Sequence, residues 1–130
     1  MKSDPKDCLY CQNNETLHNL MIEIAQLSVS RVFLFKEQTY RGRCLVAYKD
    51  HVNDLNELSD EDRNAFMADV TRVTRAMQKA FQPEKINYGA YSDKLSHLHF
   101  HLQSTEYQYS HKLSVSHWQF RSSQGHQTIY

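Results

Sequence analysis

Two kinds of apolar spacing follow one another in the first third of the chain. Apolar residues first recur every three or four positions, which predicts an amphipathic helix over about residues 13–27. From residue 27 to 35 they alternate with other residues, which predicts a β-strand. A polar segment with Gly42 and a second apolar stretch over residues 44–49 follow, so we expect a hairpin. The helical positions are Leu17, Leu20, Met21, Ile24 and Leu27.

The second half of the chain contains a clear helical pattern. Ser59 precedes three acidic residues, as at a capped helix start, and the apolar stripe that follows ends at Pro83. Residues 86–91 and 97–103 then read as two further strands. Since no strand–helix–strand repeat accompanies these strands, the pattern predicts an antiparallel α+β domain.

The character of the sequence changes after Gln103. Ser, Gln, Tyr and His become frequent, and aliphatic residues become rare. We therefore assign residues 1–103 to one domain and residues 104–130 to a divergent C-terminal tail. Alternation over residues 113–120 fits an edge strand in that tail, and a disordered tail fits equally well.

Charge and composition narrow the classes of function. The 130 residues include 15 basic and 15 acidic side chains, so no strong net charge points to nucleic acid or to a membrane surface as a partner. The N-terminus lacks the apolar segment of a signal peptide, and no apolar run reaches the roughly 20 residues that span a bilayer. We expect a cytoplasmic protein, for which a charged small molecule remains a suitable substrate.

Three histidines alternate with apolar residues in the segment HLHFHLQ. On a strand they share one face, while Leu98, Phe100 and Leu102 face the opposite side and anchor the strand. His97 and His101 would lie about 13 Å apart along the backbone, too far to converge easily on one metal ion. A single histidine is often only a satisfied core or surface residue, but three on one face indicate chemistry.

The cysteines suggest a second site. Cys8 and Cys11 form a Cys-x-x-Cys motif, which in a reducing compartment indicates redox or metal chemistry more than a structural disulfide. A redox role normally requires a thioredoxin-like strand and helix, which the pattern lacks. Zinc would need two more ligands, and two unligated thiols are the remaining alternative. Cys44, in an apolar strand, is most simply a core residue.

These motifs together resemble the histidine triad (HIT) family of nucleotide-binding hydrolases and transferases. Residues 97–102 match its alternating His-apolar signature. The segments YRGRCLVAYKDHVNDLNELSDEDRNAFM and INYGAY are similar to the turn, strands and helix start that precede the signature in that family. The resemblance covers roughly residues 8–103. It implies a HIT-like fold, with an antiparallel sheet of about five strands, one long helix and one shorter helix.

The resemblance also implies roles for the histidines. The middle one, His99, would attack the α-phosphorus of a purine nucleoside phosphoramidate or dinucleoside polyphosphate and form a covalent nucleotidyl-histidine. His101 would offer an N–H to the phosphate oxygens, as a catalytic and substrate-binding residue. Asn87 and Ser96 are further candidates for ribose or phosphate contacts, although Asn87 could equally be a turn or strand-end residue.

One branch of the family carries an N-terminal Cys-x-x-Cys that two histidines complete. The corresponding residues here are Cys8, Cys11, His51 and His97, a closed four-ligand set of the structural zinc type. The resemblance further implies a homodimer. Zinc would attach the N-terminal segment to the histidine strand.

The sequence departs from the family at the end of the signature, where Gln103 replaces an apolar residue. Two alternatives to the enzyme therefore stay open. One is a nucleotide-binding regulatory protein with little turnover, and the other is a structural zinc-binding interaction module. The base preference, the leaving group and the cellular process do not follow from the sequence.

Overall fold

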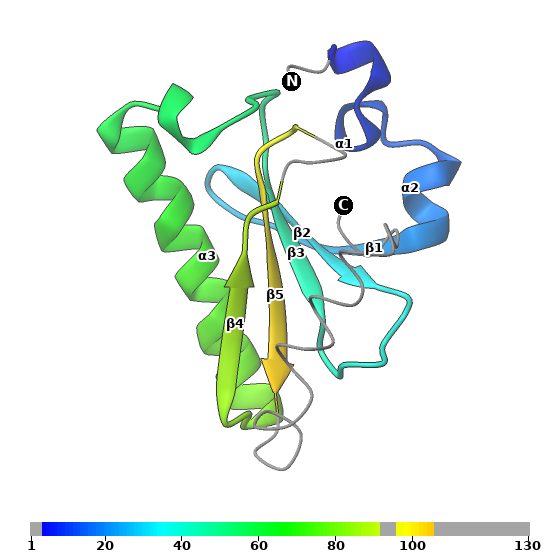
Figure 1. Ribbon diagram of the computed structural model, residues 1–130, viewed down its shortest axis with the longest axis vertical. Coiled ribbons are helices and arrows are strands. Elements are labelled where there is room, and N and C mark those ends of the chain that lie inside the picture. The colour runs from blue at the N-terminus through cyan, green and yellow to red at the C-terminus, as the bar shows by residue number, and fades with distance from the viewer. Residues whose placement is uncertain (1–3, 92–95, 106–130) are drawn as a thin grey trace.

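The computed structural model of the protein describes residues 4–91 and 96–105 (Figure 1). Three helices and five strands make up most of this part of the chain, and short 3-10 turns lie at Pro5–Asp7 and Leu55–Glu57. The helices are α1 (Leu9–Gln12), α2 (Glu15–Leu20) and α3 (Asp60–Phe81). The strands are β1 (Met21–Gln26), β2 (Ser30–Phe35), β3 (Cys44–Tyr48), β4 (Lys85–Gly89) and β5 (His99–Thr105).

The strands form one antiparallel sheet in the order β1-β2-β3-β5-β4. The predicted hairpin joins β2 to β3, and β5 lies between β3 and β4. This arrangement confirms the α+β class and the antiparallel sheet of about five strands. It places the histidine-rich strand inside the sheet, with a neighbour on each side.

The long helix forms where the sequence predicts it. The Ser59 side chain accepts a hydrogen bond from the Asp62 backbone N–H at 3.1 Å, and three acidic residues occupy the first turn. Both features satisfy or complement the exposed N–H groups of a helix start. The helix ends at Gln82, which adopts the left-handed conformation just before Pro83.

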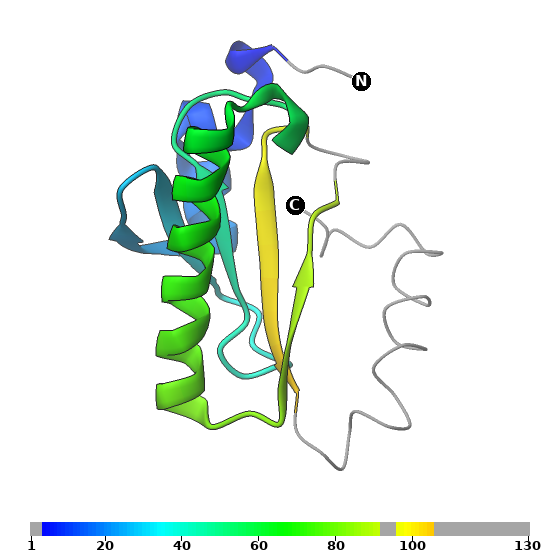
Figure 2. The same cartoon turned by 90° about the vertical axis from the view of Figure 1, so that its left-hand side faces the viewer.

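Each face of the sheet is covered by a different layer: α3 lies on one side of the strands and the N-terminal helices on the other (Figure 1), and Figure 2 views the sheet from the α3 side. Helix α3 packs on one face over a core that includes Val46, Phe66 and Leu102. The N-terminal helices pack on the other face over a second core that includes Tyr10 and Leu17. Because alternate residues of each strand face opposite sides, every central strand contributes to both cores.

The predicted helix over residues 13–27 is only partly correct. A short helix ends at Leu20, and residues 21–26 form the edge strand β1 instead. Ile22 and Ile24 point to an exposed face of that strand, with half of their surface accessible. The spacing of Met21, Ile24 and Leu27 fits a helix, but this segment pairs with β2 as an edge strand instead.

Side-chain contacts fix the two ends of the sheet against α3. Asp69 of α3 accepts hydrogen bonds from the Val29 N–H at 2.9 Å and the Ser30 hydroxyl at 2.7 Å, at the turn between β1 and β2. At the other end Gly42, with φ +80°, lies against the ring of Phe81. The helix is thereby attached to both turns that flank β2.

Strand β5 continues through Thr105, two residues beyond the predicted end of the domain. The proposed edge strand over residues 113–120 lies outside the described residues, so the division into a domain and a tail stays a prediction. None of the helices within residues 4–91 and 96–105 combines the length and apolar character that crossing a lipid bilayer requires.

Candidate functional site

The apolar residues of the histidine segment anchor it to the α3 layer. Leu98 and Leu102 belong to the core beneath α3, and Phe100 packs against that core. The three histidine rings lie toward the opposite layer, where Tyr10 and Phe35 contact them. The alternation predicted from the sequence is confirmed, although β5 itself begins only at His99.

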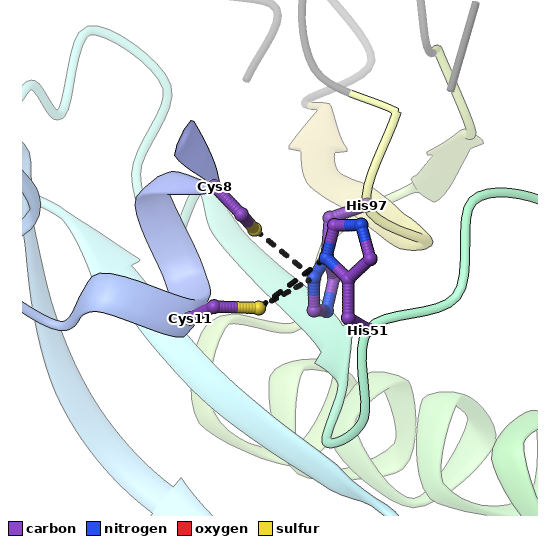
Figure 3. A group of neighbouring side chains, drawn as sticks. All are labelled: Cys8, Cys11, His51 and His97. Atoms are coloured by element: carbon purple, nitrogen blue, oxygen red, sulfur yellow. Dashed lines mark hydrogen bonds between the residues drawn. The ribbon is translucent and has the colours of Figure 1, made fainter. Parts of the chain in front are cut away.

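Four side chains from three distant segments meet beside the start of β5 (Figure 3). Their potential ligand atoms all lie within 4.8 Å of one another. They come from helix α1 and the residue before it, from the loop after β3, and from the turn before β5. The four are Cys8, Cys11, His51 and His97, the set that the family resemblance indicates.

The geometry of this group suits a tetrahedral metal ion. The Cys8 sulfur lies 3.2 Å from His97 Nδ1, and the Cys11 sulfur lies 3.3 Å from His51 Nδ1 and 3.6 Å from His97 Nδ1. Zinc bonds of about 2.0–2.3 Å hold tetrahedral ligands roughly 3.3–3.8 Å apart. These three pairs lie close to that spacing, and the four residues could therefore hold a metal ion.

The hydrogen bonds of His97 orient its ring for such a role. Its Nε2 lies 2.7 Å from the Tyr48 carbonyl oxygen, which only accepts, so Nε2 carries the proton. Nδ1 then presents its lone pair to the two sulfurs. Burial lowers the pKa of His97 to about 4, so the imidazole is neutral at neutral pH, as a metal ligand must be.

Cys11 is poorly suited to exist as a bare thiolate. Burial, together with the neighbouring Cys8, raises the pKa of the Cys11 thiol to about 12. Without a cation this thiol would hold its proton at neutral pH. A metal ion would displace the proton, because thiolates are the ligands that zinc binds.

Arg31 of β2 holds the cysteine segment in place, a role that sequence reasoning missed. Its guanidinium donates to the Tyr10 carbonyl at 2.8 Å and to the Asn13 side chain at 3.0 Å. It also forms a bidentate ion pair with Glu23, at 3.1 and 2.9 Å. The only signal in the sequence was a basic residue inside an otherwise apolar strand.

His99 is oriented by the backbone next to it. Its Nδ1 lies 2.6 Å from the carbonyl oxygen of His97. Since that oxygen can only accept, Nδ1 carries the proton and Nε2 carries the lone pair. The ring of Tyr10 packs 5.6 Å from the His99 ring, centroid to centroid, and helps to fix its orientation.

His101 lies one step further along β5, in a different environment. Its ring stacks on Phe35 at 5.7 Å and meets the His99 ring edge-on at 5.1 Å. Gly89 of β4 lies directly opposite in the sheet. The three rings therefore have separate surroundings: His97 adjoins the cysteines, His99 adjoins a carbonyl, and His101 lies between aromatic rings.

The structure separates the two predicted substrate contacts. Asn87 lies opposite Gln103, two residues from the Gly89–His101 pair, so it shares the face of His101. The Ser96 hydroxyl donates to the Asn53 side chain at 2.7 Å and links the turn before β5 to the loop after β3. This bond gives Ser96 a structural role, and its contact with substrate remains a prediction.

A cavity of about 70 Å³ lies beside the start of β5. It is formed by the loop after β3, the end of β4 and the residues around His99. Ligand sites usually enclose about 300–1,000 Å³, so this space takes only part of a nucleotide. Its lining includes Asn53, Tyr91, His97 and His99.

An antiparallel sheet that carries alternating histidines, with a long helix on one face, defines a protein of the histidine triad class. The sequence pattern of the HIT domain matches residues 15–107. The chain belongs to the HIT domain family.

One curated relative is the adenosine 5'-monophosphoramidase hnt1 of Schizosaccharomyces pombe, 30% identical over 86 residues. The match covers 62% of this chain and 62% of hnt1, so the chain spans about three fifths of that relative's length.

Solved structures share the fold. A histidine triad (HIT) protein of Sinorhizobium meliloti 1021 is similar with a TM-score of 0.69 at 19% identity, covering 84% of this chain and 90% of that one. A HIT family member from Bacillus subtilis has a TM-score of 0.65 at 18% identity, covering 95% and 98%. These similarities confirm the HIT-like fold.

Proposed function

We propose that the protein is a hydrolase or transferase that acts on the α-phosphate of purine nucleoside phosphoramidates or dinucleoside polyphosphates. The observation that carries this proposal is the 2.6 Å contact between His99 Nδ1 and the His97 carbonyl. It fixes the tautomer in which Nε2 is the nucleophilic nitrogen. Membership of the HIT domain family and the similarity to a monophosphoramidase support the choice of substrate class.

The reaction proceeds in two displacements. His99 Nε2 attacks the α-phosphorus, and the bond from phosphorus to the leaving nitrogen breaks. The leaving amine keeps the electron pair and takes a proton from solvent. Water then attacks the nucleotidyl-histidine, the bond from phosphorus to Nε2 breaks, and the lone pair returns to His99 as the water proton leaves to solvent.

The residues around His99 supply charge stabilisation and binding. His101, whose ring lies 5.1 Å from that of His99, is assigned to the phosphate oxygens as the second catalytic residue. Asn87 and Ser96 are assigned to the ribose or the phosphate. Asn87 has the stronger support, because it shares the sheet face of His101.

The group formed by Cys8, Cys11, His51 and His97 is assigned to structural zinc. Two thiolates and two neutral imidazoles neutralise the ion and complete its tetrahedral shell, which leaves no position for substrate. Zinc would supply attachment of the N-terminal segment to the histidine strand and no chemistry on phosphorus. The family resemblance leads us to propose a homodimer, which light scattering of the purified protein would test. The cytoplasmic location expected from the sequence is likewise a proposal.

Mass spectrometry of a quenched reaction with adenosine 5'-phosphoramidate tests the central step. We expect an adenylyl adduct on the peptide that contains His99, and release of AMP. His99→Ala should abolish both and still bind AMP, while His18→Ala, an exposed histidine of α2, should react like the wild type. Nucleotide binding without turnover would instead indicate a regulatory protein. Zinc binding without nucleotide binding would indicate an interaction module.

A further inference from the structure

Tyr91 combines exposure with closeness to the histidines. It follows β4, its side chain is 40% exposed, and it lines the cavity beside His99. Its ring centroid lies 6.4 Å from that of His101, at an interplanar angle of 50°. An aromatic ring that is neither buried in a core nor directed away from the site is available for contact with a ligand.

A glycine allows the ring to occupy this position. Gly89 lies directly opposite His101, and a Cβ atom there would be 2.5 Å from Tyr91 Cε2. The Tyr91 ring therefore lies over the bare backbone of β4, on the face that carries His101. Any side chain at position 89 would displace the ring from the histidines.

We propose that Tyr91 is a substrate-binding residue whose ring stacks on a planar, unsaturated ring of the nucleotide substrate. Tyrosine offers a rigid apolar face with a polar edge, and its π surface accepts such rings with little entropic cost. The planar ring comes either from the nucleobase or from an aromatic leaving group. This inference rests on the proposed function of the same site.

Steady-state kinetics of four variants tests the proposal. Stacking of a base on an aromatic side chain is worth about 1–3 kcal/mol, so Tyr91→Ala should raise KM roughly 5- to 150-fold with little change in kcat. Tyr91→Phe keeps the ring and should retain the wild-type KM. Gly89→Ala should raise KM in the same direction, because it displaces the ring without removing it.

Tyr88→Ala is the matched control. Tyr88 belongs to the same strand and is 51% exposed, but it pairs with Leu102 and so faces the α3 side. We expect its KM to match that of the wild type. All variants should share the wild-type circular dichroism spectrum and elution volume, which excludes misfolding as the cause of a change.

Three substrates distinguish the two sources of the planar ring. Adenosine 5'-phosphoramidate has an aromatic base and a small leaving group, its anilide adds an aromatic leaving group, and ribose 5-phosphoramidate has neither. Stacking on the base raises KM equally for both adenosine compounds in Tyr91→Ala. Stacking on the leaving group raises KM only for the anilide. A change below twofold for every substrate overturns the proposal.

Failure of the proposed function gives a different result. If the wild type forms no adduct and releases no AMP, binding of AMP and of its anilide by calorimetry replaces KM. Weaker binding in Tyr91→Ala and Gly89→Ala but not in Tyr88→Ala then supports the stacking role alone. Equal binding by all variants refutes it.

Discussion

His97 and His99 differ in chemistry because their hydrogen bonds fix opposite tautomers. His97 directs its Nε2 proton to the Tyr48 carbonyl and its Nδ1 lone pair to the cysteine sulfurs. His99 directs its Nδ1 proton to the His97 carbonyl and keeps the lone pair on Nε2. Since both acceptors are backbone atoms, these assignments depend on the path of the chain more than on neighbouring side chains.

The buried carboxylate of Asp69 should be important for stability. Asp69→Ala leaves the half-buried Val29 N–H and the buried Ser30 hydroxyl without their acceptor, which should cost about 2–4 kcal/mol in the free energy of unfolding. Asp69→Asn keeps one acceptor oxygen and should cost less. Urea unfolding measures both variants.

Asp60→Ala is the control for Asp69→Ala. It removes the ion pair with Arg63, in which the Asp60 side chain is 89% exposed. The pair and the favourable charge at the helix start together should contribute only about 1 kcal/mol. Equal effects of Asp60→Ala and Asp69→Ala would contradict the importance of burial.

The ion pair between Glu23 and Arg31 should make stability depend on pH. Hydrogen bonds from Arg31 lower the pKa of Glu23 below its usual value of 4.5. A lowered carboxyl pKa stabilises the fold above the usual value, and this contribution is lost as the pH falls through the folded-state pKa. Glu23→Gln should therefore cost up to about 1 kcal/mol at pH 7, and this cost should shrink as the pH falls below the usual carboxyl pKa.

Urea unfolding from pH 2 to pH 7 measures this difference for the wild type and Glu23→Gln. Glu84→Gln, at an exposed position before β4, serves as the control and should differ little from the wild type throughout. A Glu23→Gln difference that stays constant across the range would show that its effect does not come from ionisation.

At the scale of elements, the sequence correctly predicts the helices and strands whose apolar pattern agrees with the capping and turn residues at their ends. Helix α3 and the β2–β3 hairpin are confirmed because a serine cap, a proline and a glycine mark their limits. Strand β1 was missed because Met21 and Ile24, whose spacing suggested one helix face, lie on an edge strand with Met21 buried and Ile24 exposed. Composition alone cannot show which face of an edge strand is left uncovered.

The candidate site follows the same logic. The spacing of the three histidines predicts correctly that they alternate with core residues. The family resemblance indicates the two cysteines and two histidines that the structure brings together. Arg31 and Tyr91 could not be found, because their importance depends on contacts between segments far apart in the chain. Tertiary packing determines which residues from other segments contact the site.

The turn before β3 should tolerate no side chain at its glycine. Gly42→Ala places an L-residue at φ +80° and a Cβ atom 2.4 Å from Phe81 Cε2, so it should destabilise the protein by about 1–3 kcal/mol. Adding Phe81→Ala should relieve the contact but not the backbone strain, and so recover only part of the loss. Thermal unfolding of both variants measures the two contributions.

Gly89→Ala is the internal comparison for the turn. Its backbone lies in an ordinary strand, and the nearest atoms to the added Cβ belong to the side-chain ring of Tyr91 and not to the backbone. We expect a loss below about 1 kcal/mol. If Gly42→Ala and Gly89→Ala were equally stable, the argument from positive φ would be wrong.

At the scale of the whole molecule, the N-terminal layer depends on its contacts with the sheet and, we propose, on zinc. Native mass spectrometry should find one zinc ion per chain in the wild type and none in Cys8→Ser or Cys11→Ser. Removal of the ion by a chelator should lower the free energy of unfolding by at least about 2 kcal/mol, because binding energy adds to folding energy.

Cys44→Ser is the control for zinc binding. Cys44 is buried under α3, and it is not one of the four residues whose potential ligand atoms lie within 4.8 Å of one another. This variant should retain one zinc ion whatever its stability. Retention of zinc by Cys8→Ser and Cys11→Ser would place the metal elsewhere.

The alternation in β5 has a consequence for folding fidelity. If β5 shifted by one residue against its neighbours, the imidazoles would face the apolar core under α3, and Leu98 and Leu102 would leave it. Both changes are costly, since polar rings would be buried without partners and leucines would lose their packing. The histidines that we assign to chemistry therefore also favour the native register of β5, because a sheet paired in the shifted register would be less stable.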